Sequence, residues 1–176
     1  MTDDVELERL TGEATREIFA EIQVVYAAAF PGYDLGDHRS RTWRQTESPG
    51  FATITARIDG KLIGFIYGLP LGSSAAWWQG LEPPQPEAFT VETGSRTCAV
   101  IDLAVLPAHR GRGLGRRLVD AFLESRSEER ATLATNPAKT EIQQMYERWG
   151  WEKVGHVPGG KGATQPVFDL YVIALR

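Results

Sequence analysis

Short apolar runs separated by polar breaks recur along the chain, and their spacing predicts a series of strands and amphipathic helices. Residues 5–10 alternate apolar and polar side chains, which predicts a first strand. Thr11 then precedes apolar residues at helical spacing, so a helix is expected to follow it and to stop near Pro31-Gly32. Residues 33–50 are polar and ambiguous, with room for a short second helix.

A β-hairpin follows this ambiguous stretch. Residues 51–58 and 61–71 are both rich in β-branched and aromatic side chains, and Asp59-Gly60 separates them. This dipeptide supplies the positive φ angles that a tight hairpin turn requires. The pattern therefore predicts two adjacent antiparallel strands.

Residues 72–96 interrupt the pattern with three prolines, three glycines and three glutamates. A loop of this length in a compact domain is usually functional or disordered, so it forms either a flap on the substrate side or a mobile insertion. Its adjacent Trp77 and Trp78 suit two interpretations. They form a stacking wall for a ligand, or they anchor the loop on the core.

The remainder of the chain predicts four more strands and two helices, and the order of elements indicates a mixed sheet with helices on its faces. The strands are expected at 98–106, 131–135, 151–157 and 167–175. The helices are expected from Leu114 and over 138–149, where Ile142, Met145, Tyr146 and Trp149 share an apolar face and Gly150 is the C-terminal cap.

Length and composition restrict the class of protein. The 176 residues, 42% of them hydrophobic, fit one domain over residues 1–176. Cys98 is the only cysteine, the first residues do not resemble a signal peptide, and no apolar run approaches the roughly 20 residues of a membrane span. A cytoplasmic protein is expected. The net charge of -4 and pI near 5.4 argue against nucleic acid as the main partner.

The junction between the strand at 98–106 and the next helix carries the strongest chemical signal. Glycines at 111, 113 and 115 let main-chain N–H groups approach a ligand, and the helix N-terminus adds unpaired donors with partial positive charge. Together they suit phosphate oxygens, with charge-assisted bonds available from the flanking arginines Arg110, Arg112, Arg116 and Arg117.

Two common phosphate motifs do not fit this junction. It lacks the Gly-Lys-Ser/Thr ending of a P-loop, and Arg116 or Leu118 stands where the third glycine of a dinucleotide fingerprint would be. Both ATP or GTP and Rossmann-type dinucleotide binding are thus disfavoured. A turn that uses glycine for steric reasons alone, with solvated arginines, is the alternative left open.

The motif "RGRGLG", Arg110 to Gly115, resembles the R/Q-x-x-G-x-G/A signature of the GNAT superfamily of acetyltransferases, which also lies between a strand ending in "LAV" and a helix. Downstream, "NPAKTEIQQMYERWGWEKVG" is similar to the family's next segment, although Gly150-Trp151 replaces its usual Gly-Phe. The likeness runs from about Arg57 onward and is strongest over 98–155.

The resemblance implies an α/β (α+β) fold with a mixed, mostly antiparallel sheet of six to seven strands and helices on both faces. Strands four and five would splay apart to hold acetyl-CoA, with its pyrophosphate on the N–H groups of Arg112 to Arg116 and its pantetheine arm paired with the fourth strand. The implied cofactor-binding residues are Leu103, Ala104, Val105, Arg110, Gly111, Arg112, Gly113, Leu114, Gly115, Arg116, Asn136 and Tyr146.

Two residues stand out for acid–base chemistry. The resemblance puts Tyr146 in the place of the family's general acid, while its position on an apolar helix face also fits a core tyrosine. Asp102 on the fourth strand matches an acidic residue of some polyamine and small-amine members, which makes it the candidate base. Its alternatives are a carboxylate paired with a nearby Arg or Thr, or one that only attracts the amine.

The other histidines and carboxylates give weaker signals. His109 lies in the strand–helix turn and is expected to be exposed, His38 and His156 lack any context, and no cluster has metal-ligand spacing. Acidic residues in the insertion suggest a cationic acceptor, although a solvated acidic loop explains most of them. These residues are Glu82, Glu87 and Glu92, with Asp34 and Asp37 earlier in the chain.

Two function classes remain. The first is an N-acetyltransferase that acts on a small-molecule or peptide amine by direct attack within a ternary complex, with Trp77, Trp78 and Asp102 at the acceptor and no metal. The second is an acyl-CoA-binding sensor or a family member without turnover. No nucleic-acid or membrane partner is expected, and a homodimer is left open.

Overall fold

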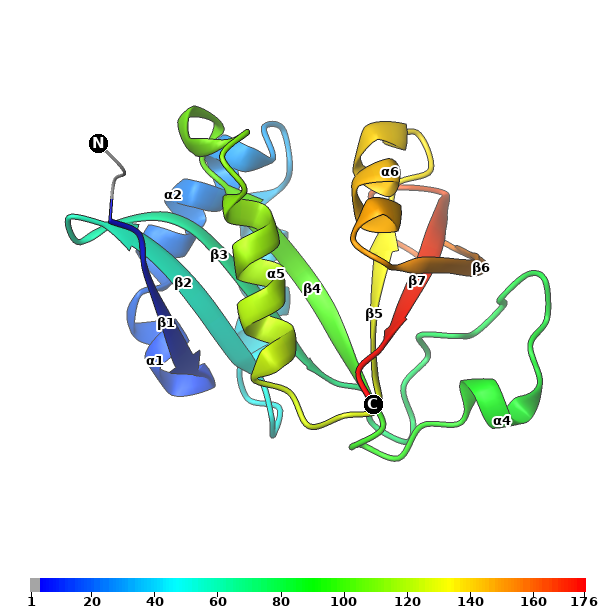
Figure 1. Ribbon diagram of the computed structural model, residues 1–176. Helices are drawn as coiled ribbons and strands as arrows, with labels where there is room; N and C mark the ends of the chain where they lie inside the picture. The colour runs from blue at the N-terminus through cyan, green and yellow to red at the C-terminus, as the bar shows by residue number, and fades with distance from the viewer. Residues whose placement is uncertain (1–3) are drawn as a thin grey trace. The chain divides into compact units, whose positions relative to one another are not determined.

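Within residues 4–176, which the computed structural model describes, seven strands are hydrogen-bonded in the order β1-β2-β3-β4-β5-β7-β6 (Figure 1). The β1–β2, β2–β3, β5–β7 and β6–β7 pairs are antiparallel, and β4–β5 is parallel. Leu106 N donates to Ile63 O and Leu71 N to Thr97 O, so β3 and β4 also run antiparallel. The mixed, mostly antiparallel sheet predicted from the sequence is confirmed.

The chain forms two compact units, and β4 contributes residues to both. Unit 1 comprises residues 4–69 and 100–126, and unit 2 comprises residues 70–99 and 127–176. That the two units act as one domain, as the length suggests, stays a prediction. In the described part of the chain, no helix is both long and apolar enough to cross a membrane.

Unit 1 holds the first four strands and most of the helices. Its core lies between α2 and the sheet, where nine apolar residues are buried together: Phe19, Ile22, Val25, Tyr26, Phe51, Leu62, Phe65, Tyr67 and Ala104. The elements are β1 (Glu6–Thr11), α1 (Gly12–Glu17), α2 (Phe19–Ala29), α3 (Leu35–Gln45), β2 (Ala52–Ile58), β3 (Lys61–Pro70), β4 (Thr97–Val105), the 3₁₀ turn η1 (Pro107–His109) and α5 (Leu114–Glu124).

The predicted hairpin is β2–β3. Asp59 and Gly60 take φ angles of 49° and 79° at its turn, as the dipeptide requires. The register shifts between Ala56 and Arg57, where Ile63 is left without a partner on β2. Such a bulge turns the following side chains of the strand to the other face.

Helices cover both faces of the sheet in unit 1. A Cβ at Gly64 would come within 3.3 Å of Leu118 on α5, whereas the next residue, Phe65, is packed in the core against α2. Adjacent strand residues point to opposite faces, so α2 and α5 lie on opposite sides of β3 (Figure 1). Gly64 gives α5 room to approach, since a side chain there would also press on Ala104 O.

The first helical segment differs from the prediction. Thr11 caps it, with its side chain accepting from Ala14 N, but the helix breaks at Ile18 and resumes as α2. The ambiguous polar stretch contains α3, whose N-cap Asp34 accepts from Asp37 N. A local cap therefore explains where this second helix begins, although its apolar pattern is weak.

Unit 2 is built on β5 (Arg130–Thr135), α6 (Thr140–Arg148), β6 (Glu152–Pro158) and β7 (Val167–Ala174). β7 lies between β5 and β6, and Cys98 on β4 has no exposed surface. Gly150, with φ 93°, ends α6 as predicted. The expected apolar face is incomplete, because Ile142 is 43% exposed while Tyr146 is buried.

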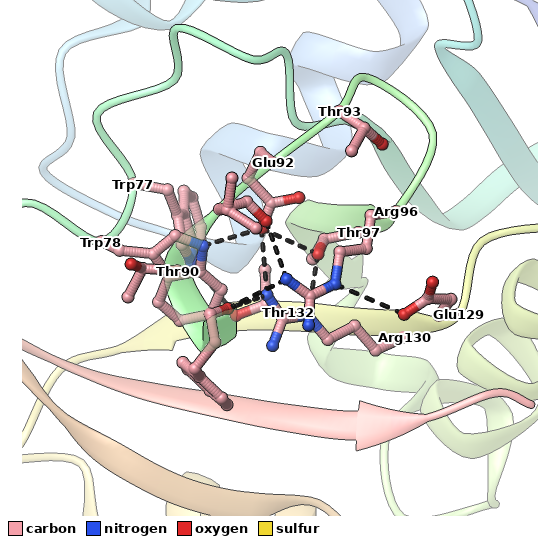
Figure 2. A network of polar contacts seen from close by, with 12 residues as sticks. Trp77, Trp78, Thr90, Glu92, Thr93, Arg96, Thr97, Glu129, Arg130 and Thr132 are labelled. Atoms are coloured by element: carbon pink, nitrogen blue, oxygen red, sulfur yellow. Dashed lines mark hydrogen bonds and ion pairs between the residues drawn. The ribbon is translucent and has the colours of Figure 1, made fainter. Parts of the chain in front are cut away.

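The insertion at 72–96 is irregular apart from one helical turn, α4 (Glu87–Thr90), and polar contacts anchor it to unit 2. Figure 2 shows the Glu92 carboxylate at the centre of this network. Its Oε2 accepts from Trp78 Nε1 at 2.8 Å, Thr97 Oγ1 at 2.9 Å and Arg130 Nη2 at 3.1 Å. The Arg130 guanidinium also lies over the rings of Trp78 and Phe89. These contacts join the insertion to β4 and β5.

A second attachment joins the insertion to β6. Glu82 and His156 exchange two main-chain hydrogen bonds of 2.9 and 2.8 Å. Gly155 makes the close approach feasible, because a Cβ there would lie 2.5 Å from Glu82 O and its φ of 149° is one that side chains rarely adopt. No pattern in the sequence predicts this contact.

We expect Glu92→Ala to lower the free energy of unfolding by about 3–5 kcal/mol, because it leaves the buried Arg130 guanidinium without its anion. The two side chains are 2% and 8% exposed. Urea unfolding monitored by tryptophan fluorescence measures the change. Glu129→Ala is the matched control: its partner Arg96 lies at 3.3 Å, but Glu129 is 68% exposed, so a loss below about 1 kcal/mol is expected. Equal losses in both variants would contradict an anchoring role for Glu92.

Candidate functional site

The strand–helix junction of unit 1 has the geometry expected of an anion site. After β4 and η1, Gly111 and Gly113 both take φ of 78°, and Gly113 is the N-cap of α5 without a side-chain capping bond. The first N–H groups of a helix have no partner within the helix. A Cβ at either glycine would meet no atom within 4 Å, so the space beside the loop is open.

Arg110 fixes the loop to neighbouring elements. Its Nε donates to Val105 O at 3.1 Å and its Nη2 to Ala29 O at 3.4 Å, so the side chain connects the end of β4 with the end of α2. Arg116 lies in the first turn of α5 and pairs with Asp120 at 3.4 Å on the exposed side of the helix. Arg110 therefore positions the loop through main-chain carbonyls.

The strand residues predicted to bind an acyl-CoA arm lie at the end of β4, just before this loop. Ala104 is buried against the unit 1 core, and Leu103 and Val105 are partly exposed. The parallel ladder with β5 consists of three pairs, from Thr97↔Arg130 to Ala99↔Thr132. Residues 100–105 of β4 thus extend beyond this ladder.

Asp102 lies on the same stretch of β4 and is held by buried polar side chains from β3 and α3. Tyr67 OH donates a short hydrogen bond to its Oδ2. His38 Nε2 lies 2.8 Å from Tyr67 OH, and Thr42 Oγ1 lies 3.3 Å from it. Within residues 4–176, the contacts of this carboxylate with Tyr67, His38 and Arg41 are all made by Oδ2, which leaves Oδ1 for another donor.

These contacts fix the direction of a hydrogen-bond chain. The single phenol proton of Tyr67 goes to Asp102, so His38 Nε2 must be the donor to the Tyr67 oxygen. His38 Nδ1 is then an acceptor, and Gln23 Nε2 lies 3.4 Å from it. The chain runs from Gln23 through His38 and Tyr67 to Asp102.

Burial sets the charges in this cluster. Burial and the nearby Arg41 lower the pKa of His38 from 6.5 to about 4, so the imidazole is neutral and its 3.7 Å approach to Asp102 is no ion pair. Burial raises the pKa of Asp102, while Arg41 and the Tyr67 hydrogen bond oppose that shift. Burial also raises the pKa of Tyr67, which therefore keeps its proton.

Arg41 on α3 completes the cluster. Its Nη1 lies 3.8 Å from Asp102 Oδ2, close enough for an ion pair but longer than a hydrogen bond. Burial lowers the pKa of Arg41, but Asp102, Tyr67 and Tyr26 outweigh that effect and raise it overall. The Tyr26 ring stacks on His38 with centroids 3.6 Å apart, and burial and Asp102 raise the pKa of its hydroxyl to about 12.

Tyr146 lies in unit 2, on α6. It is buried, and its ring makes edge contacts with Trp149 at 5.7 Å and Trp151 at 5.8 Å between centroids. The ring is therefore held by packing, as a core tyrosine would be. The role of its hydroxyl as a general acid stays a prediction.

The remaining predicted residues of unit 2 take part in local structure. Asn136 Oδ1 accepts from Ala138 N at 2.9 Å in the turn before α6. Trp77 Nε1 donates to Thr132 Oγ1 at 3.1 Å, and Trp78 is buried in the Glu92 network. Both indoles thus help to hold the insertion in place, and their role at the acceptor stays a prediction.

Sequence reasoning identified Asp102 but missed the residues around it. His38 lacked any context in the sequence, yet it is fully buried and 29 residues from its partner Tyr67. Arg41 lies within residues 33–50, whose secondary structure the sequence left ambiguous. An available signal was the i,i+3 spacing of His38 and Arg41, which puts both on one face of a helix once α3 is recognised.

Comparison with protein families gives a match over most of the chain. Residues 15–151 match the family model described as the acetyltransferase (GNAT) family. Among curated protein sequences, none is significantly similar to this chain.

Solved structures share the fold at low identity. One, from Desulfovibrio desulfuricans, is described as a GNAT-family acetyltransferase (14% identity, TM-score 0.68, covering 98% of this chain and 100% of that one). The ribosomal-protein-S18-alanine N-acetyltransferase of Escherichia coli has 11% identity and a TM-score of 0.66, covering 98% and 94%. Arabidopsis thaliana Naa50, in complex with the bisubstrate analogue CoA-Ac-MVNAL, has 12% identity and a TM-score of 0.63, covering 97% and 98%.

The buried neutral His38 predicts a pH-dependent stability. Between pH 6.5 and about 4 the unfolded chain takes up a proton on this residue that the folded chain does not, so the free energy of unfolding falls as the pH falls through that window. Between pH 7 and pH 4.5 we expect His38 to account for about 2–3 kcal/mol of the decrease in the free energy of unfolding.

Urea unfolding at the two pH values tests this contribution. His38→Gln should lose that part of the pH dependence, while His156→Gln, which changes an exposed histidine, should keep it. If His38→Gln retained the full pH dependence, the neutral buried imidazole would be the wrong assignment.

Proposed function

The chain belongs to the acetyltransferase (GNAT) family, and from this we propose that it is an N-acetyltransferase that transfers the acetyl group of acetyl-CoA to an amine within a ternary complex. The observation that carries the proposal is the open loop at Gly111 and Gly113, set between the end of β4 and the start of α5. This loop and Asp102 lie in the same unit.

The loop fits a diphosphate. With no Cβ at Gly111 or Gly113, phosphate oxygens can reach the main-chain N–H groups, and the N-terminal end of α5 favours their negative charge. Arg112 and Arg116 would add charge, while Arg110 holds the loop in place through Val105 and Ala29. Leu114 and Gly115 would contribute main-chain donors from the first turn.

The end of β4 fits the rest of acetyl-CoA. Residues 100–105 extend beyond the β4–β5 ladder, so the main-chain groups of Leu103 and Val105 can pair with the amides of a pantetheine arm as an added strand would. Main-chain donors of this strand would then lie near the acetyl carbonyl and stabilise the charge that develops on its oxygen. Asn136 would contact the arm from the turn before α6.

Asp102 is the proposed base. An alkyl ammonium has a pKa near 10.4, so fewer than about one molecule in a thousand is a free nucleophile at pH 7. Burial raises the pKa of Asp102, which makes its carboxylate a better proton acceptor, while Tyr67 holds Oδ2 and leaves Oδ1 for the amine. Asp102 takes one proton from the ammonium, and the free amine attacks the acetyl carbon to form the new N–C bond. The C–S bond then breaks to release the thiolate of CoA, while the nitrogen gives its second proton to water.

The released thiolate needs a proton, and Tyr146 is the proposed donor. By its place in the family pattern it is the candidate general acid, and its ring is fixed by Trp149 and Trp151. The relatives support the chemistry in outline. Naa50 binds a CoA–acetyl–peptide analogue, and the Escherichia coli relative acetylates an alanine of a ribosomal protein, as their names state.

Acetyl-CoA consumption with a panel of amines, set against CoA binding measured by calorimetry, tests the proposal. Turnover with any amine supports an N-acetyltransferase. Tight binding of CoA without turnover of any amine would instead favour an acyl-CoA sensor, and failure to bind CoA would refute both.

We predict that Gly113→Asp abolishes CoA binding while the chain still folds. The carboxylate would enter the proposed diphosphate space and repel it, whereas the free protein has no atom within 4 Å of the new Cβ. Titration calorimetry with CoA measures the loss. Gly60→Asp is the matched control, because its φ of 79° imposes the same strain in the hairpin turn. Normal CoA binding by Gly113→Asp would show that the phosphates bind elsewhere.

We also predict that Tyr146→Phe lowers kcat by about 10²- to 10⁴-fold, the usual contribution of a general acid, with little change in acetyl-CoA binding. The ring that packs on Trp149 and Trp151 is kept, so stability should hardly change. Single-turnover rates measure the step. Tyr171→Phe is the control, since it also removes a hydroxyl of unit 2, one that donates to Glu147 at 3.0 Å. A drop below about fivefold for Tyr146→Phe would assign the proton to water or another residue.

A further inference from the structure

The accessible side of the Asp102 cluster carries two opposite charges. His38 and Tyr67 are fully buried, whereas the side chains of Asp102 and Arg41 are 15% and 35% exposed. An acceptor that reaches Asp102 therefore meets a carboxylate and a guanidinium together. A carboxylate alone would bind any protonated amine, so the guanidinium is the group that restricts which acceptors can bind.

Arg41 has donors to offer a ligand. Its contact with Asp102, 3.8 Å from Nη1 to Oδ2, is longer than a hydrogen bond, and a guanidinium has five N–H donors in a planar fork. Tyr67 already supplies the hydrogen bond that the buried Oδ2 needs. Arg41 is thus not required to satisfy the hydrogen bonding of Asp102.

This pair of charges discriminates among amines. An ammonium group paired with Asp102 would come close to the guanidinium of Arg41, and two like charges at short range in a partly buried site repel each other. An acceptor with its own carboxylate beside the amine avoids that cost. It also gains a charge-assisted and potentially bidentate interaction with Arg41.

The spacing fits a single small molecule. In an α-amino acid the amino nitrogen and a carboxylate oxygen are roughly 3 Å apart, as bond lengths of the backbone dictate. Asp102 Oδ2 and Arg41 Nη1 are 3.8 Å apart. Oδ1, the oxygen proposed for the amine, belongs to the same carboxylate, so one amino acid can set its amine there and its own carboxylate on Arg41 at the same time.

Resting on the proposed function, we propose that the acceptor is a free amino acid, whose carboxylate Arg41 binds while Asp102 receives its amino group. Polyamines lack the carboxylate, and so do lysine side chains and the N-termini of most peptides at this distance from the amine. Arg41 is then a specificity-determining residue on α3, and the relay from His38 through Tyr67 orients the base beside it.

Matched pairs of acceptors test this specificity. Initial rates are measured for the twenty standard amino acids and for four decarboxylated counterparts: tyramine, histamine, tryptamine and cadaverine. In the unaltered protein the amino acid of each reactive pair should have a kcat/KM at least about tenfold above that of its amine, as expected for a lost hydrogen bond to a charged group.

Arg41→Gln should lower the ratio of kcat/KM for each amino acid to kcat/KM for its amine by about 10- to 150-fold. The preference of Arg41→Lys for amino acids should lie between those of the unaltered protein and Arg41→Gln, because lysine keeps the positive charge but lacks the planar set of donors of a guanidinium. Arg39→Gln is the matched control. It is on the same helix, but its guanidinium lies over the rings of Phe19 and Trp43, so the preference for amino acids should persist.

A binding measurement separates this inference from the proposed function. N-acetyltyrosine should bind the CoA-bound protein more tightly than N-acetyltyramine, and Arg41→Gln should remove that difference. Amines turned over as well as amino acids, or equal losses for both in Arg41→Gln, would overturn the inference and leave an N-acetyltransferase. No turnover of any acceptor, with CoA bound, would refute the proposed function and this inference with it.

Discussion

The carboxylate of Asp102 has to be compensated because it lies largely buried beside the core of unit 1, and several elements of that unit supply the compensating groups. β3 supplies Tyr67, which donates to Oδ2, and α3 supplies His38 and Arg41. α2 contributes the Tyr26 ring that covers His38. Side chains from β3 and α3, both far from Asp102 in the sequence, therefore meet at this carboxylate, and α2 covers one of them.

Unit 2 also contains a buried carboxylate, that of Glu92, but its surroundings differ from those of Asp102. Glu92 is almost fully buried, and a tryptophan, a threonine and an arginine all converge on its Oε2. Asp102 keeps some exposed surface and an oxygen for another donor, whereas Glu92 is enclosed by the loop that it anchors. Exposure is what separates a group suited to chemistry from one suited to holding a loop.

The sequence predicted features that depend on local rules. The hairpin turn at Asp59-Gly60, the strand–helix junction with its glycines and the cap at Gly150 follow from neighbouring residues, and the structure has each of them. Asp102 was found through its place in a motif. The seven strands followed from the apolar pattern along the chain, and the family resemblance implied a sheet of six to seven.

What the sequence could not reveal depends on distant contacts. The partners of Asp102 lie 35, 61 and 64 residues away, at Tyr67, Arg41 and His38, and no local pattern links them. The sequence left Trp77 and Trp78 with two interpretations and could not predict their hydrogen bonds to Thr132 and Glu92, which come from distant parts of the chain or from the far end of the insertion. The exposure of Ile142 on α6 likewise depends on tertiary packing.

The complete burial of Cys98 in β4 has a consequence for how the protein reacts with thiol reagents. A thiol reacts only when such a reagent can reach its sulfur, and the folded chain shields its single cysteine. An aromatic disulfide that releases a coloured thiolate when it reacts with a thiol would then detect the CoA released in the proposed reaction, because Cys98 of the folded protein does not react with it. When β4 unfolds locally, the Cys98 thiol becomes accessible to the reagent. The same colour change then measures the opening of the strand that contributes residues to both units.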